Sequence, residues 1–196
     1  MRRRAGWALA VVLAGCAATP PVPSLPAPGD VAGFEDWTAA GRLAMAAGDQ
    51  GGSGSFTWRQ DGPSTTLSIR GPLGAGALEI VTDGRALSVT DGAGRSVDTA
   101  QAEDALRTRL GADLPWTELR YWMLGVPSPG GAAEVTDSSV APLRVIEQAG
   151  WQVGYESFRA VAGAALPARF TATRGAVRLK VLIDDWTITP TAAGSP

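Results

Sequence analysis

Residues 55–91 read SFTWRQDGPSTTLSIRGPLGAGALEIVTDGRALSVTD, and this stretch decides the fold. Large apolar residues alternate with polar or small ones in four short runs, and Asp83-Gly84 and Asp91-Gly92 mark turns. Alternation with a period of two places the apolar side chains on one face of a sheet and the polar ones on the other. The alternating apolar residues are Phe56, Trp58, Leu67, Ile69, Leu78, Ile80, Leu87 and Val89.

The same alternation occurs on both sides of this stretch. Leu43 and Met45 precede it, and a second series follows near the end of the chain, with turns at Gly150 and Arg174-Gly175. We therefore predict a mainly β fold whose antiparallel sheet has one apolar and one solvated face. The late series consists of Trp151, Val153, Tyr155, Phe170, Val177, Leu179, Val181 and Ile183.

Between the two β-rich regions the period changes to that of helices. Residues 98–110 have the spacing of a capping box, with Ala102 and Leu106 on one face, and a glycine follows at the predicted end. A second helix is predicted over 115–124, and it is apolar on nearly every side, so it must be covered on several sides or line something apolar. The segment 126–142 is rich in Pro, Gly and Ser and is predicted to be a mobile loop.

The beginning of the chain has the pattern of a secretory signal. Three arginines at 2–4 precede an apolar run over 7–14, which is far shorter than the roughly 20 residues of a membrane-spanning helix. The run ends in Leu13-Ala14-Gly15-Cys16, which resembles the bacterial lipobox and implies cleavage before Cys16 and lipid attachment to it. The next residue is Ala17 and not Asp, a choice that goes with outer-membrane delivery in lipoproteins of enteric-type bacteria, so the resemblance favours that membrane. The alternative is a soluble secreted protein whose cysteine stands there by chance.

The rest of the chain divides by composition. Residues 1–15 are the predicted lipoprotein signal peptide, 16–30 an acylated, proline-rich tether, 31–190 one globular domain and 191–196 a flexible tail. Cleavage after residue 15 changes the formal net charge from −2 to −5, because it removes three arginines and no acid. An acidic chain without a basic block does not fit a nucleic-acid partner.

Residues that carry catalytic chemistry are scarce. The sequence has no histidine, its single cysteine is the predicted lipid site, and it contains neither a phosphate-binding loop nor a G-x-S-x-G nucleophile motif. We therefore predict no enzyme activity and no metal site. Asp184-Asp185 leaves one alternative, a hydrolase, if either carboxylate lies beside Glu79. Adjacent strand residues point to opposite faces, so the pair is interpreted as one exposed acid and one strand-end residue.

Two structural alternatives stay open from the residues alone. Broad aromatic side chains among many small residues are consistent with a filled core or with an apolar cavity under a helical lid. Leu73, the only large side chain in the segment from Arg70 to Gly76, either folds back onto the core or projects toward lipid or a partner.

Several segments, in order along almost the whole mature domain, resemble the outer-membrane lipoprotein receptor family LolB. They are Trp37 with Gly41-Arg42-Leu43, Ser55-Phe56-Thr57-Trp58-Arg59-Gln60, Gly71-Pro72-Leu73-Gly74, Trp122 with Gly125 and Pro127, Gly150-Trp151-Gln152-Val153-Gly154-Tyr155, and Leu179-Lys180 with Trp186. The resemblance implies an α+β fold that is mainly β with a helical lid. In it, an incompletely closed antiparallel β-barrel of about eleven strands has helices covering an apolar cavity. The periplasmic carrier LolA shares this fold, and the lipobox distinguishes the receptor from it.

The resemblance also implies a function. The protein would accept lipoproteins from LolA, shield their acyl chains in the cavity, and release them into the inner leaflet of the outer membrane. It would act as a monomer, at the periplasmic face, without nucleic acid and with no cofactor beyond the diacylglycerol and acyl chain on Cys16. The alternative is an outer-membrane lipoprotein that binds lipid or scaffolds an envelope assembly without moving cargo.

The candidate site has two parts. The loop Gly71, Pro72, Leu73 and Gly74 would protrude in this family, with the leucine promoting membrane insertion of cargo. The acyl-chain cavity is assigned by strand parity and by the apolar helix. Its predicted residues are Leu43, Met45, Phe56, Trp58, Leu67, Ile69, Leu78, Ile80, Trp116, Leu119, Trp122, Met123, Val153, Tyr155, Leu179 and Val181.

Overall fold

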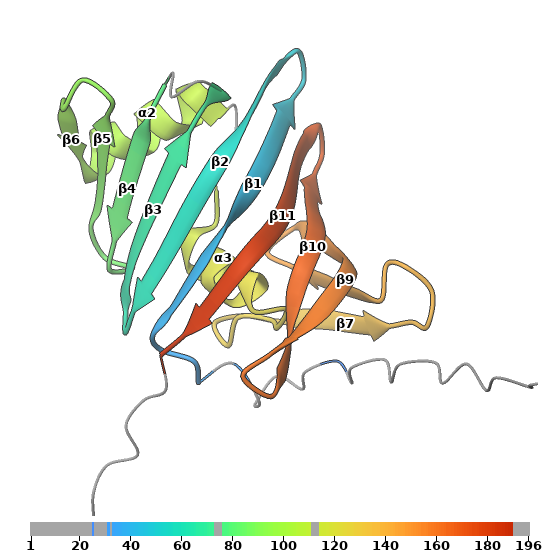
Figure 1. Ribbon diagram of the computed structural model, residues 1–196. Coiled ribbons are helices and arrows are strands. Elements are labelled where there is room, and N and C mark those ends of the chain that lie inside the picture. The colour runs from blue at the N-terminus through green and yellow to red at the C-terminus, as the bar shows by residue number, and fades with distance from the viewer. Residues whose placement is uncertain (1–24, 26–30, 32, 73–75, 111–113, 190–196) are drawn as a thin grey trace, which may run out of the picture.

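The computed structural model describes residues 25, 31, 33–72, 76–110 and 114–189 (Figure 1). The predicted signal peptide, Cys16 and the predicted tail at 191–196 lie outside the described residues, as do Leu73 and Gly74. Of the predicted tether only residue 25 is described. Among the described residues, no helix has the length and hydropathy needed to cross a membrane.

The described chain contains eleven strands and two helices longer than one turn. The first half consists of β1 (Trp37–Ala47), β2 (Gln50–Asp61), β3 (Ser64–Arg70), β4 (Leu78–Thr82), β5 (Leu87–Asp91) and β6 (Ser96–Asp98). The helices α2 (Thr99–Leu110) and α3 (Trp116–Met123) follow. The second half consists of β7 (Ala133–Asp137), β8 (Arg144–Gln148), β9 (Trp151–Val161), β10 (Ala164–Arg174) and β11 (Val177–Ile188).

All eleven strands form one antiparallel sheet in the order β6-β5-β4-β3-β2-β1-β11-β10-β9-β8-β7. Each half is a meander, and the two halves join where β1 pairs with β11. Within the described residues β6 and β7 are edge strands that do not pair with each other, so the sheet stays open. The prediction of a mainly β, antiparallel, incompletely closed fold with two helices is confirmed.

One face of the sheet carries the core. Inward-facing residues pair across neighbouring strands, as Trp58 does with Leu67 and Leu67 with Ile80. Trp37 stacks on Trp58 with ring centroids 5.9 Å apart, and all of these side chains are at least 94% buried. The alternation read from the sequence is therefore the alternation between this core and solvent.

Both helices lie on the same side of the sheet (Figure 1). Ala102 and Leu106 of α2 belong to one apolar cluster with Leu87 of β5, so the predicted face of this helix packs on the sheet. Helix α3 follows Pro115 and buries Leu119, Trp122 and Met123. The two helices occur where the change of period predicted them.

Two local predictions are wrong. The segment 126–142 contains the strand β7, which pairs with β8. All five residues of β7 are exposed, so no apolar alternation marks the strand in the sequence. Asp184 and Asp185 are both exposed inside β11, because a bulge at Ala40 and Gly41 shifts the register there and leaves Asp184 without a β1 partner.

Candidate functional site

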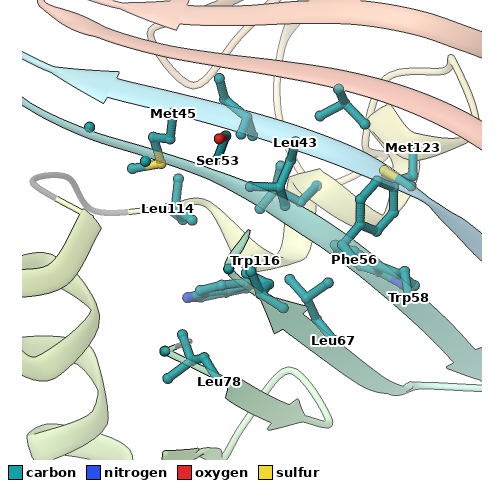
Figure 2. Close-up of a pocket in the computed structure, with 18 of the residues that line it drawn as sticks. Leu43, Met45, Ser53, Phe56, Trp58, Leu67, Leu78, Leu114, Trp116 and Met123 are labelled. Atoms are coloured by element: carbon teal, nitrogen blue, oxygen red, sulfur yellow. The ribbon is translucent and has the colours of Figure 1, made fainter. Parts of the chain in front are cut away.

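An apolar pocket of about 250 Å³ lies between the inner face of the sheet and α3 (Figure 2). Its walls come from β1, β2, β3, β4, β10 and β11, from α3 and from the segment before α3. The lining residues are Leu43, Met45, Gln50, Gly51, Gly52, Ser53, Phe56, Trp58, Leu67, Ile69, Gly71, Gly76, Leu78, Leu114, Trp116, Leu119, Met123, Phe170, Leu179 and Val181.

The register between β1 and β2 accounts for the empty space. Leu43 pairs with Gly54 and Met45 pairs with Gly52, so neither large side chain has a side chain opposite it on β2. A Cβ atom built on Gly52 would have no heavy atom within 4 Å. The glycine-rich beginning of β2 therefore leaves a gap that the side chains of neighbouring strands do not fill.

Helix α3 forms one wall through a single stripe. Trp116, Leu119 and Met123 recur at a spacing of three and four residues, which places them on the same face of the helix. Leu114 extends this wall before the helix begins. Figure 2 shows Leu114 close to Met45 and Trp116 close to Leu67 and Leu78, among the side chains that surround the pocket.

Polar contacts hold the other side of α3 against the sheet. The buried Gln148 of β8 accepts hydrogen bonds from Trp122 Nε1 at 3.1 Å and from the Ser128 backbone N–H at 2.9 Å. Its amide donates to the carbonyl of Ser128 at 2.8 Å and to that of Gly131 at 3.3 Å. One side chain thus ties the helix and the segment that follows it to β8.

Two further groups fix the end of α3. The Tyr155 hydroxyl donates to the Trp122 carbonyl at 2.8 Å, and burial raises the pKa of this tyrosine well above its ordinary value, so it stays a neutral donor. Arg144 donates to the Gly125 carbonyl at 3.1 Å and forms a bidentate pair with Asp137 at 2.7 and 2.8 Å. The arginine lowers the pKa of the Asp137 carboxyl.

The predicted cavity residues fall into two groups. Twelve of them line the pocket: Leu43, Met45, Phe56, Trp58, Leu67, Ile69, Leu78, Trp116, Leu119, Met123, Leu179 and Val181. The remaining four, Ile80, Trp122, Val153 and Tyr155, are fully buried in the core beyond the pocket. Strand parity selects a face of the sheet but not a position along it, so it does not separate these two groups.

Some lining residues have no counterpart in the prediction. Gly51, Gly52 and Gly76 contribute backbone, and Leu114 precedes the predicted helix. Phe170 lies on the core-facing side of β10, so the alternation on this strand is consistent with its place in the pocket wall. The glycine signal is present in the sequence, but it becomes informative only once the β1–β2 register is known.

The loop is described in part. Gly71 lines the pocket, and the exposed Pro72 follows it. Leu73 and Gly74 lie outside the described residues, as does Cys16, so the membrane-insertion loop and the lipid site remain predictions.

The pocket has the chemistry of a site that holds apolar groups. None of the described residues that line it carries an ionisable side chain, and its few polar groups are those of Gln50, Ser53 and the backbone. No group of three or more His, Cys, Asp or Glu side chains within the described ranges is placed to hold a metal ion. The arrangement can exclude water from a hydrocarbon chain, and it presents no acid or base to one.

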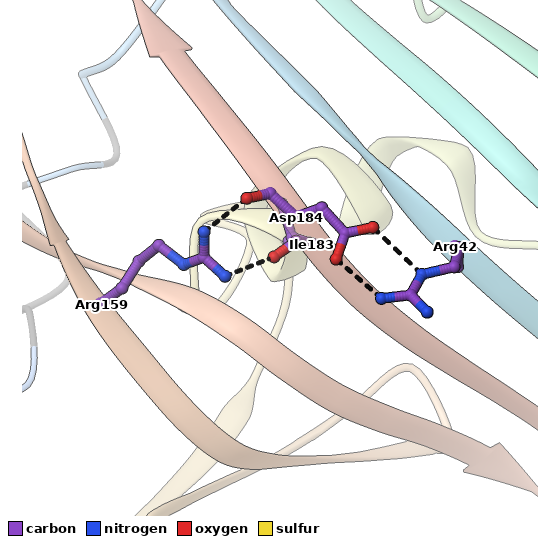
Figure 3. A network of polar contacts seen from close by, with 4 residues as sticks. All are labelled: Arg42, Arg159, Ile183 and Asp184. Carbon is purple, nitrogen blue, oxygen red and sulfur yellow. Dashed lines mark hydrogen bonds and ion pairs between the residues drawn. The ribbon is translucent and has the colours of Figure 1, made fainter.

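Asp184 belongs to a different arrangement on the opposite face of the sheet (Figure 3). Arg42 forms a bidentate pair with its carboxylate at 2.9 and 3.1 Å and lowers the pKa of that carboxyl. Arg159 donates to the backbone carbonyls of Ile183 and Asp184. Glu79 lies on β4, with β3, β2 and β1 between it and β11, so the paired carboxylates of a hydrolase are not formed there.

The chain is thus an open antiparallel sheet with two helices on its core face and an apolar pocket between the sheet and α3, and this fold is shared by a solved protein. The structure is similar to the crystal structure of a LolA superfamily protein from Nitrosomonas europaea, with a TM-score of 0.50 and 13% identity. The likeness covers 81% of this chain and 88% of that one.

Within this class, a family profile described as "Outer membrane lipoprotein LolB" matches residues 35–186. The chain is 35% identical over 191 residues to the outer-membrane lipoprotein LolB of Halorhodospira halophila, covering 94% of each chain. It is also 35% identical over 157 residues to that of Alkalilimnicola ehrlichii, covering 79% and 78%. The chain belongs to the LolB family of outer-membrane lipoproteins.

Proposed function

We propose that this protein receives lipoproteins from the periplasmic carrier LolA, shields their acyl chains in its pocket and releases them into the inner leaflet of the outer membrane. The observation that carries the proposal is the pocket, whose described lining is apolar and free of ionisable side chains. Membership of the LolB family supports it independently.

The energetics of lipid transfer demand such a pocket. Exposing an acyl chain to water costs about 0.8 kcal/mol for each methylene, so several chains together cost tens of kcal/mol. A carrier and a receptor avoid this cost only if the chains pass from one apolar site to the next. The sequence contains no phosphate-binding loop, so this chain brings no nucleotide hydrolysis to the transfer, and hand-over runs downhill in free energy.

Helix α3 is the proposed lid. The pocket volume of about 250 Å³ is slightly below the range of roughly 300–1,000 Å³ that is usual for ligand sites, so cargo must widen it. The Trp122 end of α3 is held by Gln148 and Tyr155. Trp116, at the other end, makes no side-chain hydrogen bond with the described residues, so we expect the lid to open there.

The anchor and the loop complete the proposal. Lipid on Cys16 would hold the domain beside the bilayer, and Leu73 would promote transfer of cargo into it. We expect Leu73→Glu to leave the fold and cargo uptake intact but to stall release. Partitioning of a fluorescent lipoprotein between the variant and liposomes tests this role, and an unchanged release rate would refute it.

The pocket itself is tested by filling it at Gly52. Leucine at this position would project into open space without meeting the backbone, so Gly52→Leu should preserve the fold. The added side chain would occupy volume that an acyl chain needs, and we expect at least a tenfold weaker affinity for a triacylated lipopeptide, equivalent to about 1.4 kcal/mol. Binding is measured by fluorescence of a dansylated lipopeptide.

Gly131→Leu is the matched control. A Cβ atom at Gly131 also has no heavy atom within 4 Å, but this residue is exposed and does not line the pocket. Transfer from LolA is then followed with both variants in the same assay. If Gly52→Leu binds and accepts the lipopeptide as well as Gly131→Leu does, the pocket does not hold the acyl chains and the proposal fails.

A further inference from the structure

The face of the sheet opposite the pocket carries a group of cations, which we call the basic face: Arg42, Arg70, Arg169, Arg178 and Lys180. Each residue alternates along its strand with residues that line the pocket or fill the core, so it points away from them. All five are exposed. They lie on the four strands β3, β1, β11 and β10.

The strand register brings these residues together. Ser55 of β2 pairs with Arg70 on one side and with Arg42 on the other. Arg42 in turn pairs with Leu182, which pairs with Arg169. Lys180 and Arg178 follow on β11, toward the end of the sheet that holds the β1–β2 turn.

Most of this positive charge is not neutralised within the protein. Arg42 pairs with Asp184 at 2.9 Å, and Arg169 lies 3.8 Å from Glu156. Arg70, Arg178 and Lys180 form no ion pair with the described part of the chain. Two further carboxylates lie on this face: Glu79 on β4, which pairs with Ser68, and Asp185 on β11, which is exposed and pairs with Ala40. A chain whose formal net charge is −2 thus presents one face with excess positive charge.

The surface between the cations is low and flat. Between Arg70 and Lys180 lie β2 and β1, which present Ser55 and Ala44 on this side. Three strand spacings of about 4.8 Å separate the two cations across the sheet. Shallow hollows on both sides of Arg42 follow this surface, and one of them reaches Gly71 and Pro72.

We propose that the basic face binds the anionic headgroups of phospholipids at the bilayer surface. Phosphate oxygens accept charge-assisted hydrogen bonds from Arg and Lys, and a flat cationic surface matches a flat anionic one. The family places this protein at the outer membrane, so a bilayer is within reach. The pocket extends to the same end of the sheet, at Gln50, Gly71 and Gly76, so this contact would hold that end against the membrane. The inference concerns the outer face and does not depend on what the pocket binds.

Lys180 offers a direct probe, because it is the only lysine in the chain. The full chain with its anchor is reconstituted in vesicles of phosphatidylcholine alone or of phosphatidylcholine mixed with phosphatidylglycerol. The rate of Lys180 acylation by an N-hydroxysuccinimide ester is measured by mass spectrometry. We expect acylation to be about fivefold slower in the anionic vesicles, the factor that corresponds to one cation held at an anionic surface. High salt should remove the difference, because it shortens the Debye length to about 3 Å at 1 M.

Arg59→Lys supplies an internal reference in every sample. Arg59 lies on the same face but toward the other end of β2, where it pairs with Thr66. Its lysine replacement should react equally fast in both kinds of vesicle, which separates contact from a general effect of the anionic surface on amines. Arg70→Ser combined with Arg178→Ser should abolish the protection of Lys180. Equal Lys180 rates in both lipids, or full protection in the double variant, would overturn the proposal.

Discussion

Gln148 provides the sharpest test of how the fold holds the lid. Leucine has nearly the same shape as glutamine but makes none of its hydrogen bonds, so Gln148→Leu isolates the polar contribution. In the native structure this side chain is 95% buried and receives hydrogen bonds from Trp122 Nε1 and from the Ser128 N–H. The substitution leaves both donors without their partner in a buried environment.

The expected magnitude follows from these contacts. Each buried donor left unsatisfied costs about 1–3 kcal/mol, so two donors cost about 4 kcal/mol. The carbonyls of Ser128 and Gly131 also lose a partner, while burial of the leucine side chain returns about 1–2 kcal/mol. We expect a net loss of about 3 kcal/mol in the free energy of unfolding.

Urea denaturation followed by tryptophan fluorescence measures this loss. With an m-value of about 2 kcal/mol/M, the midpoint should fall by about 1.5 M. Gln152→Leu is the matched control on the neighbouring strand, because the exposed Gln152 side chain donates only to the exposed Glu147 among the described residues. This substitution should change stability by less than about 0.5 kcal/mol. A midpoint for Gln148→Leu equal to that of the control would refute the reasoning.

Two further predictions concern the sheet and its acid stability. A Cβ atom on Gly41 would collide with the Leu182 carbonyl across the bulge, so we expect Gly41→Ala to lower the free energy of unfolding by about 3 kcal/mol in urea denaturation. Gly52→Ala is the control, because its Cβ atom meets no heavy atom within 4 Å, and it should leave the denaturation midpoint nearly unchanged. Arg144 lowers the pKa of Asp137 in the native state, so in acid the unfolded state binds more protons than the native state does. The contribution of this pair to stability is therefore present above about pH 4 and is lost as the pH falls through the depressed native pKa. Asp137→Asn should therefore reduce the slope of stability against pH below pH 4 in urea titrations, and an unaltered slope would contradict this assignment.

The faces of the strands could be predicted from the sequence because each side chain obeys a local rule. Phe56, Trp58, Leu67 and Ile69 alternate with polar residues, and the structure places all four along the pocket. The helices could also be predicted from a local pattern, because the period of the apolar residues changes where the helices begin. Such features need no knowledge of which strands become neighbours.

The features that were predicted wrongly or not at all depend on which strands become neighbours in the sheet. The gap at the pocket requires Met45 to face Gly52, a pairing that the alternation of β1 and β2 does not specify. Strand β7 is held through its backbone to β8 and has no buried side, so its residues carry no apolar signal. The two exposed acids of β11 follow from a bulge that forms only when β1 lies beside it.

The seam between β1 and β11 has a consequence for the order of folding. Each meander forms from contacts between segments close in the chain, but the seam joins Leu43 to Val181, residues separated by most of the domain. Such contacts carry a large loop-closure entropy and form late. The two halves of the sheet therefore cannot unite until the last strand is available. During synthesis, the neighbours within the first meander are available early, whereas the central pairing waits for Val177–Ile188, so the seam is the last part of the sheet to form.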